Sequence, residues 1–139
     1  MKSLFVGVDV SKLWLDISVI GGKSKETALR VDNTKMGFRK GVQWLKRMKS
    51  QEEWLICMEH TGVYSQPLWE YLVGKKIEYC VVPGSVITNG LSIKRGKSDK
   101  LDALTIASFA RRYADELKAH KLPTGLLRRL KLLYAYRDR

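Results

Sequence analysis

The sequence has little cysteine: only Cys57 and Cys80 occur among its 139 residues, and both lie inside apolar runs. Two cysteines are too few for a disulfide scaffold or a zinc site, and they fit a protein kept in a reducing cytosol. No apolar run approaches the roughly 20 residues that a membrane-spanning helix requires. The N-terminus, Met1–Val6, reads as a strand, because it lacks a long apolar stretch with a signal-peptide cleavage site. The sequence therefore argues against a secreted, membrane-spanning or zinc-finger protein and indicates a cytoplasmic one.

Acidic residues are also scarce. The chain carries 26 Lys and Arg against 14 Asp and Glu, a formal net charge of +12, while hydrophobic residues make up 45%. That hydrophobic share is enough for a folded core, and the length suits one domain. Residues 94–139 hold 13 of the basic residues, so the last third of the chain carries most of the excess charge. A solvated helix face is the ordinary explanation of a charge run, but an excess of this size favours nucleic acid as a partner.

Short apolar and alternating runs predict five strands, and apolar residues at helical spacing predict the helices between them. The expected order, β-β-β-α-β-α-β-α, suits a mixed sheet covered by helices. That order is the one expected of an α/β, ribonuclease-H-like fold. The predicted strands are 4–10, 13–20, 26–31, 54–58 and 77–82, and the predicted helices are 37–49, one starting at 65–67, 99–118 and 126–139. Residues 84–97 are predicted to form a loop.

Four acidic residues do not look like surface charges. Asp9 lies in an apolar strand, and Glu59 ends another apolar run. Asp99 and Asp102 are three residues apart at the start of the predicted helix 99–118, so they should share the face that packs on the sheet. Burying carboxylates without a partner is costly, and converging carboxylates repel one another. A divalent cation resolves both problems, and oxygen ligands without a His or Cys cluster favour Mg²⁺ or Mn²⁺. In a basic protein, such a pocket suggests phosphodiester chemistry.

Each of these carboxylates also has a structural explanation. Asp9 can cap a turn, Asp99 can be a helix N-cap, and Asp102 can simply favour the helix dipole. Taken one at a time, the structural explanations are the stronger ones. Convergence of all four by accident is less expected.

Three sequence blocks occur in a fixed order. They are Gly7-Val8-Asp9-Val10-Ser11-Lys12, Glu59-His60-Thr61-Gly62-Val63-Tyr64 and Lys97-Ser98-Asp99-Lys100-Leu101-Asp102-Ala103, with an apolar strand before the third. Each block alone is weak, but the ordered set is fairly specific. It resembles the motif blocks of the DEDD transposases of the insertion-sequence-110 family, which include the Piv-type DNA invertases. The resemblance extends from about residue 4 to residue 120.

The resemblance implies a RuvC-like, ribonuclease-H-type catalytic domain that binds Mg²⁺ or Mn²⁺ through Asp9, Glu59, Asp99 and Asp102. It implies DNA strand cleavage and exchange during transposition, by a recombinase guided by a structured RNA that the element encodes. In that family a helical coiled-coil segment follows, and a C-terminal transposase domain then supplies a serine nucleophile. Active sites assemble between protomers, so a homo-oligomer in a bacterial or archaeal cytosol is expected.

The end of the chain departs from the family's pattern. We expect residues 1–121 to form the RuvC-like domain and residues 122–139 to begin the helical coiled-coil segment, with the C-terminal domain absent. The chain then represents a fragment, a truncated reading frame or an isolated domain. Such a piece is not expected to be an active recombinase alone.

Residues beside the motif blocks are candidates for nucleic-acid contact. The basic residues before the third block are favoured as backbone-phosphate contacts, which give affinity without sequence choice. Gly62 would allow close approach of a nucleic acid or simply form a turn, and Lys12 could equally be solvated. Tyr64 could stack on a base, but a core position is the stronger expectation. The candidates are Lys12, Thr61, Gly62, Lys94, Arg95, Lys97, Arg128 and Arg129.

Two other functions remain open. A non-catalytic basic module for nucleic-acid binding would explain the charge, but it leaves the carboxylates inside apolar runs unexplained. Actin-like ATPases and sugar kinases also begin with Gly-x-Asp on a first strand. They need a duplicated domain and glycine-rich phosphate loops, for which this chain is too short.

Overall fold

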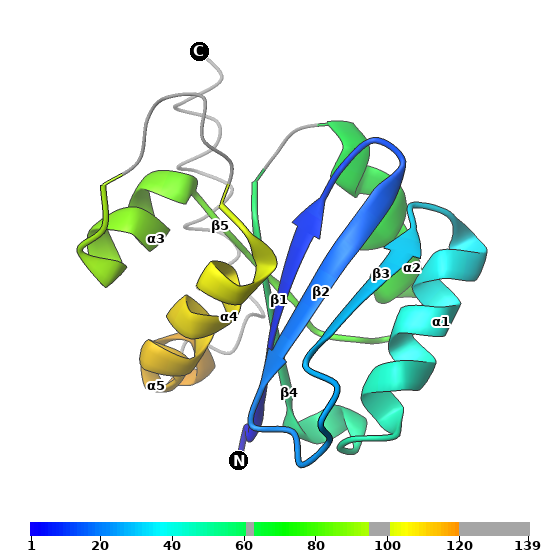
Figure 1. Ribbon diagram of the computed structural model, residues 1–139, viewed down its shortest axis with the longest axis horizontal. Helices are drawn as coiled ribbons and strands as arrows, with labels where there is room; N and C mark the ends of the chain where they lie inside the picture. The colour runs from blue at the N-terminus through cyan, green and yellow to red at the C-terminus, as the bar shows by residue number, and fades with distance from the viewer. Residues whose placement is uncertain (61–62, 95–100, 120–139) are drawn as a thin grey trace.

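A mixed β-sheet, covered by helices on both faces, organises the chain (Figure 1). The computed structural model describes residues 1–60, 63–94 and 101–119. Within them, five strands form one sheet in the order β3-β2-β1-β4-β5. The strands are β1 (Leu4–Val10), β2 (Trp14–Ile20), β3 (Ala28–Asp32), β4 (Trp54–Glu59) and β5 (Cys80–Val82).

The strand directions follow from the lengths of the connections. β1, β2 and β3 are joined by short turns and pair antiparallel, whereas β4 and β5 arrive after helical crossovers and pair parallel. The first three strands therefore form an antiparallel meander, and the two later strands extend the sheet on the other side of β1. The expected ribonuclease-H-like mixed sheet of five strands is confirmed.

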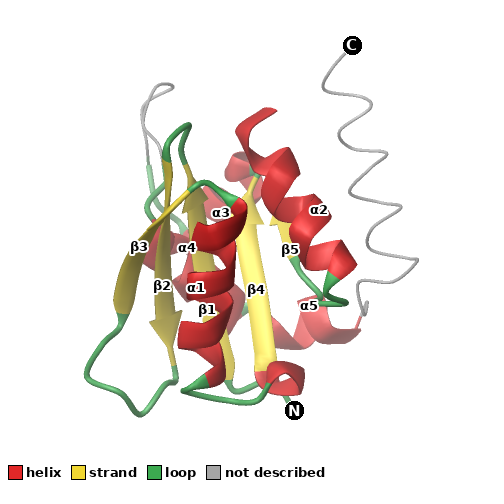
Figure 2. Ribbon diagram, turned by 90° about the vertical axis from the view of Figure 1, so that its right-hand side faces the viewer, coloured by secondary structure: helices red, strands yellow, loops and turns green. Residues whose placement is uncertain are grey.

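Alternation along the strands sends apolar side chains to both faces of the sheet. On one face, Val6, Val8 and Ile56 join the apolar stripes of α1 (Lys35–Lys46) and α2 (Gln66–Gly74). Figure 2 views the sheet from the side that α1 covers, with α4 behind it. On the other face, Cys57 and Val82 pack with α3 (Gly84–Leu91), α4 (Ala103–Arg112) and α5 (Ala114–Ala119). The result is a three-layer α/β arrangement.

The signals at the start of α1 and α2 act as predicted. Thr34 is the N-cap of α1, and its hydroxyl accepts a hydrogen bond from the Gly37 amide at 3.1 Å. α2 begins directly after Ser65, with Pro67 in its first turn, where a missing amide hydrogen costs nothing. Short 3₁₀ turns, η1 (Gln51–Glu53) and η2 (Val63–Ser65), precede β4 and α2.

The predicted loop 84–97 is wrong in its first half, because residues Gly84–Leu91 form α3. The segment combines β-branched residues with glycine at its start, so its intrinsic helix propensity is low. Tertiary contact outweighs that preference, since Ile87 is fully buried in the cluster beneath α3. The Thr88 hydroxyl also donates to the Gly84 carbonyl at 3.1 Å.

The predicted helix 99–118 is also corrected. α4 begins at Ala103, and α5 follows it after a break at Tyr113, whose hydroxyl donates to the Gly90 carbonyl at 2.6 Å. Ile106 and Phe109 face the sheet as expected, and both are buried. The fifth strand is likewise shorter than the predicted 77–82, because only Cys80–Val82 pair with β4. The predicted helix 126–139 and the segment 122–139 lie outside the described residues.

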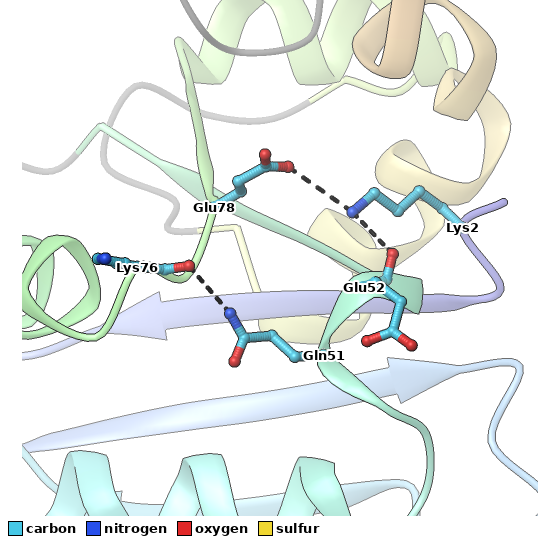
Figure 3. A network of polar contacts seen from close by, with 5 residues as sticks. All are labelled: Lys2, Gln51, Glu52, Lys76 and Glu78. Carbon is cyan, nitrogen blue, oxygen red and sulfur yellow. Dashed lines mark hydrogen bonds and ion pairs between the residues drawn. The ribbon is translucent and has the colours of Figure 1, made fainter.

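Polar contacts link the segments at the end of the sheet where β1 begins (Figure 3). Lys2 Nζ donates to the Glu52 carbonyl at 3.1 Å and lies 3.7 Å from a Glu78 carboxylate oxygen. The Gln51 side-chain amide donates to the Lys76 carbonyl at 2.9 Å. These contacts join the N-terminus to the segments before β4 and β5. The protein's own residues therefore fill the end of the sheet where β1 begins.

A glycine sets how closely α4 approaches the central strand. A Cβ at Gly7 would collide with the backbone of Ala103 and Ala107 in α4. Ala103 and Ala107 are themselves buried, so small residues on both elements allow the helix to lie directly on β1. The N-terminus of α4 is therefore held over the C-terminal half of β1.

Two further features agree with the sequence. Cys57 and Cys80 are buried thiols on neighbouring strands, and burial raises the pKa of the Cys80 thiol to about 12. In the part of the chain that the structure describes, no helix has the length and apolar character needed to cross a membrane.

We predict that Gly7→Ala lowers the free energy of unfolding by about 2–3 kcal/mol, because the added methyl group forces α4 away from β1. Urea denaturation measures the change. The matched control is Gly74→Ala at the exposed end of α2, where a Cβ has no neighbour within 4 Å. The control should be neutral or stabilising by up to about 1 kcal/mol, since alanine favours helix. Equal stabilities for the two variants would contradict the close approach of α4.

Candidate functional site

Two of the four predicted carboxylates lie at the ends of neighbouring parallel strands. β1 and β4 pair in parallel with Val8 opposite Met58, so the next residues in this register are Asp9 and Glu59. Val8 and Met58 point to the sheet face that α1 and α2 cover. Because side chains alternate along a strand, the next residues, Asp9 and Glu59, belong to the face that α4 covers. Glu59 is only 8% exposed. The predicted convergence of these two side chains at one edge of the sheet therefore agrees with the strand register.

Asp102 reaches the same edge from the other direction. It is the N-cap of α4, in extended conformation, and its Oδ1 accepts a hydrogen bond from the Thr105 amide at 2.7 Å. Asp9 and Asp102 line one shallow cleft of about 410 Å³ at the end of the sheet. The expectation that Asp102 lies within a helix is wrong, because the helix starts one residue later, at Ala103. Asp99 itself lies outside the described residues.

The cleft contains an ion pair that the sequence analysis missed. Asp16 lies directly across from Asp9 on β2, and Arg30 lies across from Asp16 on β3. Arg30 donates from Nε and Nη2 to the two carboxylate oxygens of Asp16 at 2.8 and 3.1 Å. The pKa of the Arg30 guanidinium is raised by this hydrogen bond and by the negative charges of Asp16 and Asp9. The polar residues at alternate positions of these two strands were the available signal, but only the strand register reveals the pair.

A side-chain amide holds together the loops that follow the two carboxylate strands. Asn33 Nδ2 donates to the Ser11 carbonyl at 2.9 Å and to the Tyr64 carbonyl at 3.1 Å. Ser11 lies two residues after Asp9, and Tyr64 lies in η2 after Glu59. This tie between distant loops was not predicted from the sequence.

The residue after Glu59 belongs to the opposite face. The His60 ring lies 6.0 Å from the Trp69 ring, centroid to centroid, at a tilt of 34°. Trp69 comes from α2, and its indole donates to the Met58 sulfur at 3.0 Å. His60 is therefore part of the packing beneath α2 rather than of the cleft that holds Asp9.

The predicted nucleic-acid contacts are only partly within the structure. Lys12 is exposed in the turn after β1, three residues beyond Asp9, and Lys94 is exposed beyond α3. Tyr64 is 45% exposed, so the expectation of a core position is wrong. Tyr64 belongs to the short η2 turn, in which Ser65 is the buried residue, so the core does not cover the Tyr64 ring. The candidates outside the described residues are Thr61, Gly62, Arg95, Lys97, Arg128 and Arg129.

The donor set determines which cation the edge can hold. Within residues 1–60, 63–94 and 101–119, no group of three or more His, Cys, Asp or Glu side chains is arranged as a metal cluster. A Mg²⁺ ion does not require one, because it keeps several waters and binds proteins through one or two carboxylates. Asp9 and Glu59 supply such a pair, and Asp102 adds a carboxylate in the same cleft as Asp9. The residues present therefore fit a hard, oxygen-seeking cation rather than zinc.

Comparisons with known proteins relate the chain to one family and to one solved fold. The family model DEDD_Tnp_IS110, described as a transposase, matches residues 6–139. Among solved structures, the RuvC structure of Thermus thermophilus is similar in fold, with a TM-score of 0.57 and 11% sequence identity. The match covers 81% of this chain and 96% of that chain. No curated protein matches the chain in sequence.

We predict that the two possible roles of Asp102 separate in its variants. Asp102→Ala removes the cap of α4 and should lower the free energy of unfolding by about 1 kcal/mol in metal-free buffer. Asp102→Asn keeps an oxygen that accepts from the Thr105 amide, so its stability should stay within about 0.5 kcal/mol of the parent. Urea denaturation in EDTA measures both. An Asn variant as unstable as the Ala variant would show that capping is not what the side chain contributes.

Proposed function

The chain belongs to the IS110 family of DEDD transposases, and from this premise we propose that its carboxylate edge binds a divalent ion for DNA strand cleavage and exchange. The proposed ion is Mg²⁺ or Mn²⁺. One observation carries the proposal. Asp9 and Glu59 occupy the same register position at the ends of two paired strands, on the sheet face where Asp102 also lies. A buried carboxylate beside a second one needs a compensating charge, and a cation supplies it.

Each carboxylate has a distinct part in the proposal. Asp9 and Glu59 are the principal ligands, and their positions on two paired strands hold them in a preorganised geometry. Asp102 is oriented by its capping bond, which uses Oδ1 and leaves Oδ2 outside that bond. Asp99, in the third motif block, is proposed as the fourth ligand on the basis of the family resemblance. When bound, such an ion would polarise a phosphate and activate the attacking oxygen.

The surrounding residues are proposed to hold the DNA strand over this edge. Lys12 and Lys94 are exposed, so their positive charges can contact the phosphates of a nucleic acid. The other proposed contacts are Thr61, Gly62, Arg95, Lys97, Arg128 and Arg129. The family resemblance supports three further partners of the whole recombinase, namely a structured guide RNA, a C-terminal transposase domain and further copies of the chain. Residues 1–121 are proposed as the catalytic domain and 122–139 as the start of the helical segment that follows.

The test is metal binding by the chain and its variants. We predict that Mn²⁺ binding, measured by isothermal titration calorimetry, weakens about tenfold or more in Asp9→Asn and in Glu59→Gln, because each substitution removes an anionic ligand. Circular dichroism should show an unchanged fold. The matched control is Asp115→Asn, an exposed aspartate on α5 away from the cleft, which should bind Mn²⁺ like the parent.

Two outcomes would contradict the proposal. Undiminished Mn²⁺ binding by Asp9→Asn would remove Asp9 from the site. Nucleic-acid binding that is identical in Mg²⁺ and in EDTA, together with no specific Mn²⁺ binding, would favour the non-catalytic basic module instead. That second function is kept in view because the described residues contain no preformed three-residue metal cluster.

A further inference from the structure

Among the residues that the structure describes, one cationic side chain, Arg30, lines the cleft beside Asp9, and its orientation is fixed on two sides. The Arg30 guanidinium is held edge-on by two hydrogen bonds to Asp16, and one of its faces lies over the Trp14 ring, 4.5 Å from the ring centroid. Hydrogen bonding and stacking restrict an arginine more than either does alone. A surface lysine, by contrast, moves among several rotamers in the solvent.

The guanidinium still has donors to offer. Asp16 takes one hydrogen from Nε and one from Nη2, so the hydrogens on Nη1 and the second hydrogen on Nη2 lie outside this pair. The Arg30 side chain is 58% exposed, and Arg30 lines the same cleft as Asp9 and Asp102. A planar fork of N–H groups facing an open cleft is the geometry with which arginine binds phosphate oxygens.

Stability does not account for the pair. An exposed ion pair such as this one contributes little to folding, because solvent screens the attraction between its charges. Asp16 also lies directly across from Asp9, and two like charges in that position oppose each other across the strands. Arg30 offsets the charge of Asp16 in this row of residues.

We propose that Arg30 binds a phosphodiester oxygen of the DNA strand in the Asp9–Asp102 cleft, with Asp16 and Trp14 holding its guanidinium in position. This inference rests on the proposed function, because a phosphate enters a cleft lined by three carboxylates only when a divalent ion offsets their charge. The contact should therefore form in Mg²⁺ and be weak in EDTA. A positively charged group fixed before the substrate arrives loses little freedom on binding.

The test is a salt titration of DNA binding by fluorescence anisotropy, with a labelled DNA duplex in MgCl₂ and in EDTA. We predict that Arg30→Gln weakens binding in Mg²⁺ about tenfold and lowers the slope of log K against log salt by about one, because one phosphate contact is lost. In EDTA the same variant should differ little from the parent. The matched control is Arg39→Gln, an exposed arginine of α1 on the other side of the sheet, which should not show this dependence on Mg²⁺.

Asp16→Asn separates phosphate binding from a structural ion pair. If Arg30 binds phosphate, Asp16→Asn removes a repulsive charge and keeps the salt slope of the parent, whereas Arg30→Gln lowers it. If the pair is only structural, the two variants change the melting temperature and the DNA affinity together. That joint change, or an effect of Arg30→Gln no larger than that of Arg39→Gln in Mg²⁺, would overturn the inference.

The failures of the two proposals are distinguishable. Arg30→Gln that binds DNA like the parent, while Asp9→Asn abolishes Mn²⁺ binding, removes Arg30 and leaves the metal site standing. Unchanged Mn²⁺ binding in Asp9→Asn removes the proposed function itself. Binding of a matched RNA duplex that depends on Arg30, with DNA binding unaffected, would assign the contact to RNA and overturn the inference as stated for DNA.

Discussion

The contact between Gly7 and the backbone of α4 is the constraint on which the site depends. A side chain at Gly7 would collide with Ala103 and Ala107, so its absence lets the helix lie directly on the central strand. Asp9 follows Gly7 by two residues on the same face, and Asp102 immediately precedes Ala103. One close approach therefore places a strand carboxylate and a helix-capping carboxylate in the same cleft. Displacement of α4 would separate them without any change in their own chemistry.

The two ends of the sheet differ: stabilising contacts fill one, and the other carries the carboxylates of the proposed site. Where β1 begins, Lys2, Gln51 and the segment before β5 are joined by polar contacts, and that edge is filled. Where β1 and β4 end, Asp9 lines the cleft and Glu59 is buried, and the segments with Ser11 and Tyr64 follow. Asn33 ties those segments together, since its amide donates to carbonyls in both. The carboxyl ends of parallel strands are the usual place for a site in an open α/β sheet, and the proposed site lies at such ends.

Structural features that depend on local sequence could be predicted. Features that depend on strand register or on tertiary contacts could not. Apolar runs interrupted by Asp9 and Glu59 identified both the strands and the carboxylates, because burial of a charge is improbable without a purpose. α3 was missed because its glycines and β-branched residues give it a low helix propensity, which the burial of Ile87 outweighs. The Asp16–Arg30 pair was missed because cross-strand neighbours depend on register. Asp102 was identified as a candidate, but its capping role follows from where the helix starts.

The proposed binding of a divalent ion by Asp9, Glu59 and Asp102 is the central claim. The most direct test is a crystal structure of the chain grown with Mn²⁺, with the metal located by its anomalous scattering. The account predicts a peak at the ends of β1 and β4, within about 2 Å of carboxylate oxygens of Asp9 and Glu59. An ordered Mn²⁺ ion elsewhere on the chain, with none at this edge, would contradict it.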